Sequence, residues 1–373
     1  MTDLITPITM PKFGLAMTEG KITSWNIPSG AQVEAGQEIA DIETTKITNG
    51  YESPASGTLR RQIATEGETL PVGALLGVLA EPAVSDADID AFIAKFQADF
   101  SSDSAADTQA DHAEPIMISV GDLTLRVQEA GQGDATPVLF IHGFGGDLSN
   151  WMLNQNALST DRRTLAFDLP GHGGSSKNVG DGTPAGFAAT TAALLDKLEI
   201  TSVHVVGHSL GGAIALELAK TCPQKVASLS LIAPAGLGQS INMDFIEGFI
   251  SADRRKTLEP VLNYLVHDKT LISRKMVEDI IRFKRLDGAL QGLQTIAKAC
   301  FPNGRQAEDL RPVLTSFAGP AQIIWGEADE VLSSNDAKNL PDTIPVTLLP
   351  QTGHMPQLEK AADVNAALIK FAK

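Results

Sequence analysis

The chain changes its hydrophobic pattern once, near residue 116, and this change limits it to two different kinds of domain. Residues 1–80 contain apolar runs of about 4–6 residues separated by turn sequences, and they lack sustained helical periodicity. From Ile116 onward, near-continuous apolar runs alternate with helical segments, a pattern typical of parallel strands covered by helices on both faces. We therefore predict a multidomain chain with a small all-β domain followed by an α/β domain, which suits its 373 residues.

The boundaries of these parts follow from changes in composition. We predict a β domain over residues 1–82, a short helix and flexible acidic linker over 83–115, and an α/β domain over 116–373. In the last part, helical segments from about 236 to 313 interrupt the alternation and predict an inserted cap. The strands expected in the sheet are 138–141, 164–167, 203–206, 229–232 and 322–325. In the β domain, residues 29–39 resemble residues 64–75, which suggests an internal duplication.

The region between the domains has two parts. An amphipathic stretch from Asp86 to Phe100 carries apolar residues at helical spacing, namely Ile89, Phe92, Ile93 and Phe96. The tract from Ser101 to Glu114 has no large apolar residue and predicts a flexible linker. The helix either packs against one of the two domains or docks a partner subunit.

Charge and cysteine content exclude several classes of function. The net charge of −16 provides no basic surface for a phosphate backbone, so we expect no nucleic-acid partner. The two cysteines, Cys222 and Cys300, lie outside any metal-ligand spacing, so neither a zinc site nor a disulfide framework is expected. The first residues lack the pattern of a signal peptide, and no apolar run reaches about 18 residues. We expect a cytoplasmic protein that does not enter a membrane.

A candidate nucleophile stands between an expected strand and an expected helix. Ser209 lies in Gly207-His208-Ser209-Leu210-Gly211, which fits the G-x-S-x-G pattern. Glycines on both sides allow the sharp turn that exposes the hydroxyl group. A serine needs a base to take its proton and an acid to orient that base. Late in the chain, His354 follows an apolar run and is the candidate base, and the candidate acids are Glu327, Asp329 and Glu330.

The same chemistry requires two N–H donors for a tetrahedral intermediate. The backbone of Leu210, at the start of the expected helix, and the backbone of Phe144 in His142-Gly143-Phe144-Gly145-Gly146 are the candidates. Three further histidines, His142, His172 and His208, lie near these residues in sequence. We expect them to fix loop geometry through hydrogen bonds. The residues from Ile116 onward resemble the α/β-hydrolase family, and this resemblance favours Asp329 as the acid.

The β domain carries a different motif. The run Asp41 to Ile47, with Lys46 near its end, and the following Tyr51 to Gly57 resemble the lipoyl-domain signature, a small flattened barrel. This resemblance spans residues 5 to 80 and implies that Lys46 carries lipoate through an amide. A biotinyl domain is the alternative, but its lysine normally lies between two methionines, whereas Thr45 and Ile47 flank Lys46. Thr45 also replaces the aspartate that usually precedes the lysine of lipoyl domains.

A lipoyl domain fused to an α/β-hydrolase domain resembles the dihydrolipoamide acetyltransferase components of acetoin dehydrogenase complexes. The resemblance implies transfer of acetyl from the lipoyl group on Lys46 to coenzyme A, through an acetyl group on Ser209 that His354 helps to form and resolve. It also implies two partners, a thiamine-diphosphate-dependent acetoin-cleaving component and a flavin-dependent dihydrolipoamide dehydrogenase. The chain lacks the His-x-x-x-Asp-Gly motif of the 2-oxoacid dehydrogenase acyltransferases and shows no peripheral-subunit-binding domain.

Two alternative functions are consistent with the same two domains. A thioesterase would pass the acyl group to water through the same triad, and an inert carrier would not need the intact triad at all. For coenzyme A, the basic run Arg282-Phe283-Lys284-Arg285 in the expected cap suggests either a phosphate contact or a solvated helix face.

Overall fold

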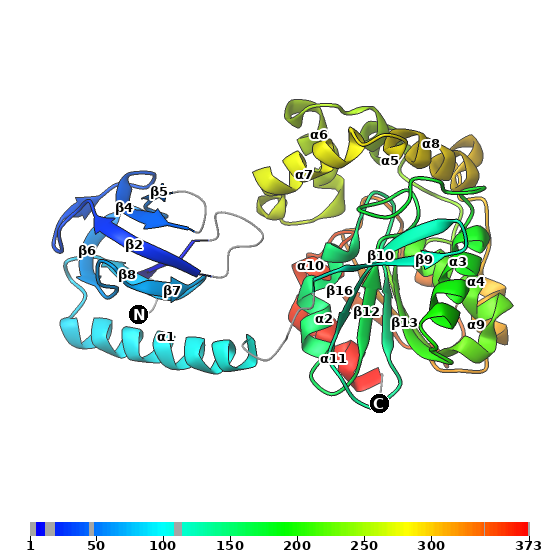
Figure 1. Ribbon diagram of the computed structural model, residues 1–373, viewed down its shortest axis with the longest axis horizontal. Helices are drawn as coiled ribbons and strands as arrows, with labels where there is room; N and C mark the ends of the chain where they lie inside the picture. The colour runs from blue at the N-terminus through cyan, green and yellow to red at the C-terminus, as the bar shows by residue number, and fades with distance from the viewer. Residues whose placement is uncertain (1–4, 12–18, 45–47, 108–113, 339, 372–373) are drawn as a thin grey trace. The chain divides into compact units, whose positions relative to one another are not determined.

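The chain divides into two compact units, residues 1–109 and residues 110–373 (Figure 1). The structure is a computed structural model and describes residues 5–11, 19–44, 48–107, 114–338 and 340–371. Among the described residues, every helix is too short or too polar to cross a membrane. Each unit is built around its own hydrophobic core.

The first unit consists of two antiparallel sheets that enclose a small core. One sheet has the strand order β1-β8-β6-β3 and the other β5-β4-β2-β7. Ile22, Ile39, Ile42 and Leu59 are among the side chains buried between them. This architecture confirms the prediction of a small all-β domain. The strands are β1 (Ile5–Thr9), β2 (Glu19–Trp25), β3 (Gln32–Val33), β4 (Glu38–Glu43), β5 (Thr48–Glu52), β6 (Gly57–Gln62), β7 (Thr69–Pro71) and β8 (Leu75–Ala80).

The backbone of this unit supports the internal duplication. Gly30 and Gly36 have φ angles of 91° and 83°, and Gly67 and Gly73, at the same spacing in the second stretch, have 87° and 86°. Left-handed backbone of this kind is accessible to glycine at little cost. The two similar stretches therefore make the same pair of turns.

Helix α1 (Asp86–Asp107) belongs to the first unit and packs on side chains of its strands β1 and β8. Ile89 is fully buried, and Phe92, Ile93 and Phe96 pack beside it on side chains of β8. Of the two roles predicted for this helix, its apolar face serves the first. The helix also continues through Asp107, whereas the sequence predicted a flexible tract from Ser101. Neither glycine nor proline occurs between residues 86 and 107, so no residue type there terminates a helix.

The second unit is built on an eight-stranded sheet with the order β16-β15-β14-β13-β11-β12-β10-β9. The strands from β16 to β12 are parallel, and β10 and β9 are antiparallel to their neighbours. The strands are β9 (Ile116–Val120), β10 (Leu123–Ala130), β11 (Val138–Ile141), β12 (Thr164–Phe167), β13 (Val203–His208), β14 (Val226–Ile232), β15 (Ala321–Gly326) and β16 (Val346–Leu349). The predicted strand segments all fall within this sheet.

Helices cover both faces of the sheet, which explains the continuous apolar runs. Along β11, Leu139 and Ile141 join the core beneath α3 and α4, whereas Val138 and Phe140 join the core beneath α2 and α11. Between β14 and β15, where an insertion was predicted, α5 to α8 gather beyond one end of the sheet (Figure 1). The helices are α2 (Met152–Leu158), α3 (Pro184–Lys197), α4 (Leu210–Thr221), α5 (Met243–Ser251), α6 (Arg255–Leu262), α7 (Arg274–Lys284), α8 (Ala289–Cys300), α9 (Arg311–Ser316), α10 (Pro356–Glu359) and α11 (Ala361–Phe371).

Candidate active site

Ser209 occupies the sharp turn between β13 and α4. Its φ and ψ angles are 54° and −118°, a backbone conformation that residues with a side chain rarely adopt. The backbone holds this turn from both sides, because Ser209 N–H donates to Ile232 O at 3.0 Å and Ser209 O accepts from Ala235 N–H at 3.0 Å. The side chain is partly exposed. Strain of this type concentrates at functional sites.

The turn is possible only because its neighbours are glycines. A Cβ atom at Gly207 would lie 2.4 Å from Gly211 O, and one at Gly211 would lie 2.1 Å from Ile141 O. Gly143 approaches the serine itself, since a Cβ there would lie 3.0 Å from Ser209 Cβ. The loop that contains Phe144 therefore runs directly past Ser209.

Asp329 lies in the loop after β15, and its side chain is fully buried. Four N–H groups donate to the carboxylate. His354 Nδ1 and Trp325 Nε1 lie 2.8 Å from Oδ2, and the amides of Val331 and Leu332 lie 2.8 and 3.0 Å from Oδ1. Burial by itself would raise the pKa of Asp329, but His354 and these hydrogen bonds hold it below its usual value. The carboxylate is thus kept ionised.

His354 is held on two sides. Its side chain is 2% exposed, and its Nδ1–H donates to Asp329, which leaves Nε2 to act as a base. Its backbone carbonyl accepts a hydrogen bond from His208 Nε2 at 2.7 Å. Because His208 directly precedes Ser209, this bond ties the histidine loop to the serine turn.

The other candidate acids do not contact His354 in this way. Glu327 and Glu330 lie in the same loop and are exposed. Glu330 instead pairs with Lys269 at 3.0 Å. The structure therefore brings His354 together with Asp329, the acid that the family resemblance favoured.

The two candidate N–H donors lie at the same end of the sheet. Leu210 begins α4, and Phe144 lies in the loop after β11 that passes Ser209. Among the residues that the structure describes, neither amide has a hydrogen-bond acceptor. Both N–H groups are therefore available to an incoming oxygen atom.

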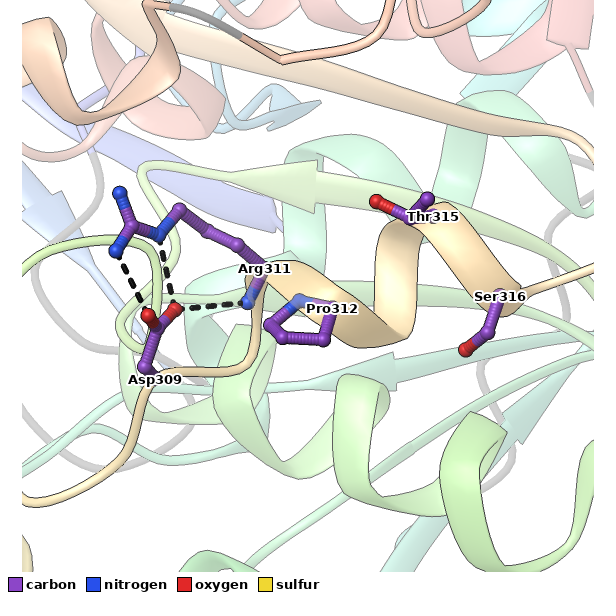
Figure 2. A pocket seen from close by; sticks show the side chains of 5 residues that line it. All are labelled: Asp309, Arg311, Pro312, Thr315 and Ser316. Atoms are coloured by element: carbon purple, nitrogen blue, oxygen red, sulfur yellow. Dashed lines mark hydrogen bonds and ion pairs between the residues drawn. The ribbon is translucent and has the colours of Figure 1, made fainter.

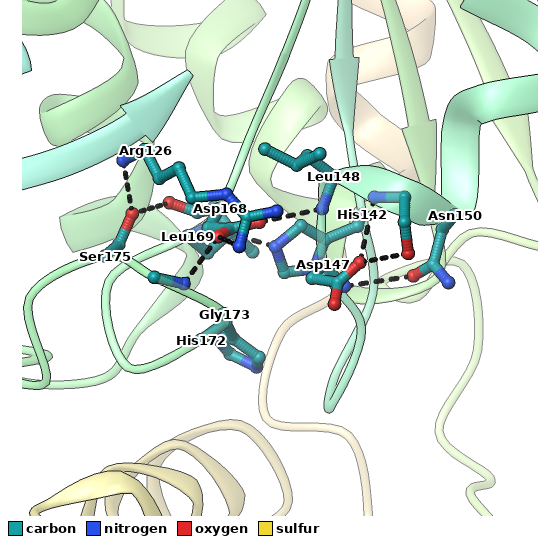
Figure 3. A network of polar contacts seen from close by, with 12 residues as sticks. Arg126, His142, Asp147, Leu148, Asn150, Asp168, Leu169, His172, Gly173 and Ser175 are labelled. Carbon is teal, nitrogen blue, oxygen red and sulfur yellow. Dashed lines mark hydrogen bonds and ion pairs between the residues drawn. The ribbon is translucent and has the colours of Figure 1, made fainter. Parts of the chain in front are cut away.

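Two buried histidines, His142 and His172, hold the loop of Phe144. Figure 3 shows both rings and the contact of His142 with Leu169. His142 Nδ1–H donates to Gly143 O at 2.8 Å, and its Nε2 accepts from Leu169 N–H at 3.0 Å. His172 Nε2 accepts from Gly145 N–H at 3.1 Å. Burial lowers the pKa of His172 to about 3, so the ring stays a neutral acceptor. These bonds agree with the prediction that the histidines near Ser209 fix loop geometry.

An aromatic cluster covers the Phe144 loop. The ring of Phe144 lies 5.8 Å from that of Phe249 in α5, 6.5 Å from Phe301 and 6.5 Å from His172. All four side chains are buried. The helical insertion therefore packs directly on the loop beside Ser209.

Two of the four residues in the basic run 282–285 support this packing of the insertion. Phe283 stacks on His172 at 6.4 Å, and Lys284 Nζ donates to the carbonyl groups of Phe249 and Ala252. Arg282 lies on the exposed side and pairs with Asp279.

Lys46 lies outside the described residues. The strands that flank it, β4 and β5, pair with Glu43 opposite Thr48. In sequence, Lys46 therefore falls between two strands that pair with each other.

A surface hollow of about 580 Å³ lies apart from these residues, at α9 (Figure 2). Its lining includes Asp309 and Arg311, which pair with each other at 2.7 Å. It contains none of the predicted site residues, and we assign it no role.

Two residues that contact the loops of Asp329 and His354 were not identified from the sequence. Trp325 donates to Asp329, and Glu359 accepts from Gly353 N–H at 2.6 Å, one residue before His354. Trp325 ends an apolar run, so a place in the core was enough to explain it. Glu359 lies in a helical segment, so a solvated charge on a helix was enough to explain it. Their nearness to the predicted acid and base was the one available signal.

Comparison with known proteins identifies both units. The family described as alpha/beta hydrolase fold matches residues 136–361, and the family described as Biotin-requiring enzyme matches residues 6–79. Among solved structures, a meta-cleavage product hydrolase from Pseudomonas fluorescens IP01 has a TM-score of 0.62 at 21% identity, over 69% of this chain and 96% of that chain. This similarity supports the fold of the second unit.

Two curated relatives match nearly the whole chain. The dihydrolipoyllysine-residue acetyltransferase component of acetoin cleaving system of Pseudomonas putida is 44% identical over 98% of both chains. The protein of the same name from Cupriavidus necator is 42% identical, over 99% of this chain and 98% of the relative. The chain therefore belongs to the family of dihydrolipoyllysine-residue acetyltransferase components of acetoin cleaving systems.

Proposed function

We propose that this acetyltransferase component moves acetyl from a thioester on the lipoyl group of Lys46 to coenzyme A, through an acetyl ester on Ser209. The observation that carries the proposal is the buried hydrogen bond of 2.8 Å between His354 Nδ1 and Asp329 Oδ2, in a loop tied to the serine turn by His208. It orients Nε2 of His354 as the base that a serine nucleophile requires.

In the first half-reaction, Ser209 Oγ attacks the thioester carbonyl carbon while His354 Nε2 takes the hydroxyl proton. The amides of Leu210 and Phe144 stabilise the negative oxygen of the tetrahedral intermediate. When the C–S bond breaks, His354 gives its proton to the departing sulfur. Asp329 stabilises the imidazolium in between, because its carboxylate remains ionised.

The second half-reaction reverses these steps with a different thiol. His354 takes the proton of the coenzyme A thiol, the sulfur attacks the acetyl carbon, and Ser209 leaves with the proton that His354 returns. Atoms and protons balance over the cycle, and no oxidant is needed.

The lipoyl group would supply a dithiol that carries acetyl as a thioester. The family match over residues 6–79 and the paired strands on both sides of Lys46 fit attachment at that residue. The lipoyl signature, in which Thr45 and Ile47 replace the methionines of biotinyl domains, supports lipoate over biotin.

The choice of coenzyme A over water rests on the family and on the aromatic cluster. Phe144, Phe249 and Phe301 form an apolar cover beside Ser209, which disfavours water as the acyl acceptor. Hydrolysis remains the second candidate function, because a water molecule can use the same triad. For the coenzyme A phosphates, Arg285 is a better candidate than Arg282, since Arg282 already pairs with Asp279.

As further parts of the proposal, the chain works with a thiamine-diphosphate-dependent acetoin-cleaving component and with dihydrolipoamide dehydrogenase. Both described cysteines, Cys222 and Cys300, are free thiols, as expected of a reducing compartment, and we propose a cytoplasmic location.

The test follows radiolabelled acetyl from the acetylated, lipoylated chain with and without coenzyme A. We expect acetyl-coenzyme A as the main product and no transfer in Ser209→Ala, while lipoylation of Lys46 persists in that variant because the two units are separate. Free acetate at equal rates with and without coenzyme A would favour the hydrolase. Transfer by Ser209→Ala would refute the serine mechanism.

A further inference from the structure

The carboxylate of Glu359 joins two segments that are far apart in sequence. Glu359 ends α10, and its Oε1 accepts from Gly353 N–H at 2.6 Å. Its Oε2 accepts from the amides of His267 and Asp268 at 2.7 and 3.2 Å. One side chain therefore holds both the residue before His354 and a segment of the helical insertion between α6 and α7.

These segments meet backbone to backbone. A Cβ atom at Gly353 would lie 2.8 Å from His267 N and from Val266 C, so no side chain fits between them. On the other side, a Cβ at Gly326 would lie 2.1 Å from Gly353 O. The loop of His354 is thus enclosed between the Asp329 loop and the segment 266–268.

A second carboxylate provides a natural comparison. Glu330, the residue after Asp329, accepts from Lys269 Nζ at 3.0 Å. Lys269 Nζ also donates to the carbonyl groups of Asn263 and Val266. Glu330 therefore tethers the same part of the insertion to the Asp329 loop by an exposed ion pair, without any bond to the His354 loop.

We propose that Glu359 is a positioning residue for His354. It keeps the His354 side chain in place by fixing the His354 loop to segment 266–268 of the insertion. The proposal rests on the proposed function, in which His354 is the base. Hydrogen bonds from backbone N–H groups to a carboxylate are stronger than hydrogen bonds between neutral groups. Among the described residues, Glu359 is the one side chain that is hydrogen-bonded to both segments. The same side chain therefore fixes the position of the insertion and the orientation of His354.

Glutamine at this position is a sharp probe. Both oxygens of Glu359 accept N–H groups, whereas a glutamine amide offers one oxygen and a nitrogen that donates. In Glu359→Gln, one of the two segments must therefore face a second donor and lose its bond. Glu330→Gln is the matched control, because it removes the same charge and loosens the same part of the insertion.

The experiment measures turnover of p-nitrophenyl acetate by the full chain, with hydrogen exchange over residues 263–272. We expect kcat of Glu359→Gln to fall about tenfold or more with KM nearly unchanged, and Glu330→Gln to stay within about twofold of the parent. Exchange should rise in both variants. Equal kcat in the two variants would overturn the inference, because the effect would then come from the insertion alone.

Two further variants keep the outcomes distinct. Glu359→Asp retains both acceptor oxygens on a shorter side chain, so we expect a partial recovery of kcat relative to Glu359→Gln, and no recovery counts against the inference. If Glu359→Gln does not fold, Glu359→Asp is compared with the parent, and unchanged kcat refutes the inference. Ser209→Ala tests the proposed function separately from the role of Glu359. Activity that persists in Ser209→Ala would refute the serine mechanism, whereas the results for the Glu359 variants would not.

Discussion

Replacing Asp329 with asparagine should separate the role of charge from that of shape in this site. The two side chains have nearly the same volume, but asparagine has one acceptor oxygen and one donor group. Four N–H groups donate to the two oxygens of Asp329, two to each. Either orientation of the asparagine therefore leaves two buried donors without an acceptor.

The magnitude follows from this count. A buried donor left without an acceptor costs about 1–3 kcal/mol, so the free energy of unfolding should fall by about 2–6 kcal/mol. If the nitrogen faces His354, the ring must adopt the other tautomer and Nε2 no longer acts as a base. A change of this type in a Ser-His-Asp triad lowers kcat by about 10⁴-fold.

Both quantities are accessible on the full chain. Urea unfolding followed by tryptophan fluorescence gives the stability, and turnover of p-nitrophenyl acetate gives kcat. Glu330→Gln, one residue further along the same loop, is the control and should change kcat by no more than about twofold. An Asp329→Asn variant that stays within tenfold of the parent kcat and loses less than about 2 kcal/mol of stability would refute the assignment of Asp329 as the acid.

Four further predictions concern other parts of the chain. Trp325→Phe removes one donor to Asp329 and should lower the free energy of unfolding by about 1.5–3 kcal/mol in urea melts, and an unchanged value would mean that this bond is not formed in solution. Burial lowers the pKa values of His172 and His208 to about 3, so between pH 6.5 and 3 the unfolded chain binds protons that the folded chain does not. Stability should therefore be complete above pH 6.5 and fall below it by about 1.4 kcal/mol per pH unit for each histidine, and urea melts of His172→Gln at pH 7 and 5 should show a smaller loss than the parent. Phe96→Ala should destabilise the first unit by about 1–2 kcal/mol, less than a fully buried phenylalanine because Phe96 is only partly buried, whereas the exposed Lys95→Ala should have little effect in thermal melts. Lys46→Arg should show no added mass after incubation with lipoate and a lipoate ligase, and retained lipoylation would place the modification elsewhere.

Local patterns were sufficient for the two kinds of domain. The segments 138–141 and 164–167 are strands with the predicted bounds, because a strand buried on both faces is apolar at nearly every position. The helix after Ser209 begins at Leu210 as its sequence suggests, since the glycines that permit the turn are adjacent in the chain. Such features depend on neighbours a few residues away, and these are visible in the sequence.

The end of α1 was not predicted because no single residue marks it. The polar tract from Ser101 was expected to be flexible, but polarity does not prevent a helix where glycine and proline are absent. Its apolar face was visible in the sequence, whereas the surface that it covers on β8 was not.

The sequence by itself determined the motif around Ser209, the candidate acids and base, and the lipoyl signature around Lys46, because each depends on residue types at short spacing. The family resemblance favoured Asp329 among the three candidate acids, and the tertiary structure gave the physical reason, because Asp329 bonds to His354 whereas Glu327 and Glu330 are exposed. Only the tertiary structure decided the roles of Trp325 and Glu359. Their hydrogen bonds join loops that the chain brings together through the sheet and the helical insertion, and contacts of this range leave no pattern in a single sequence.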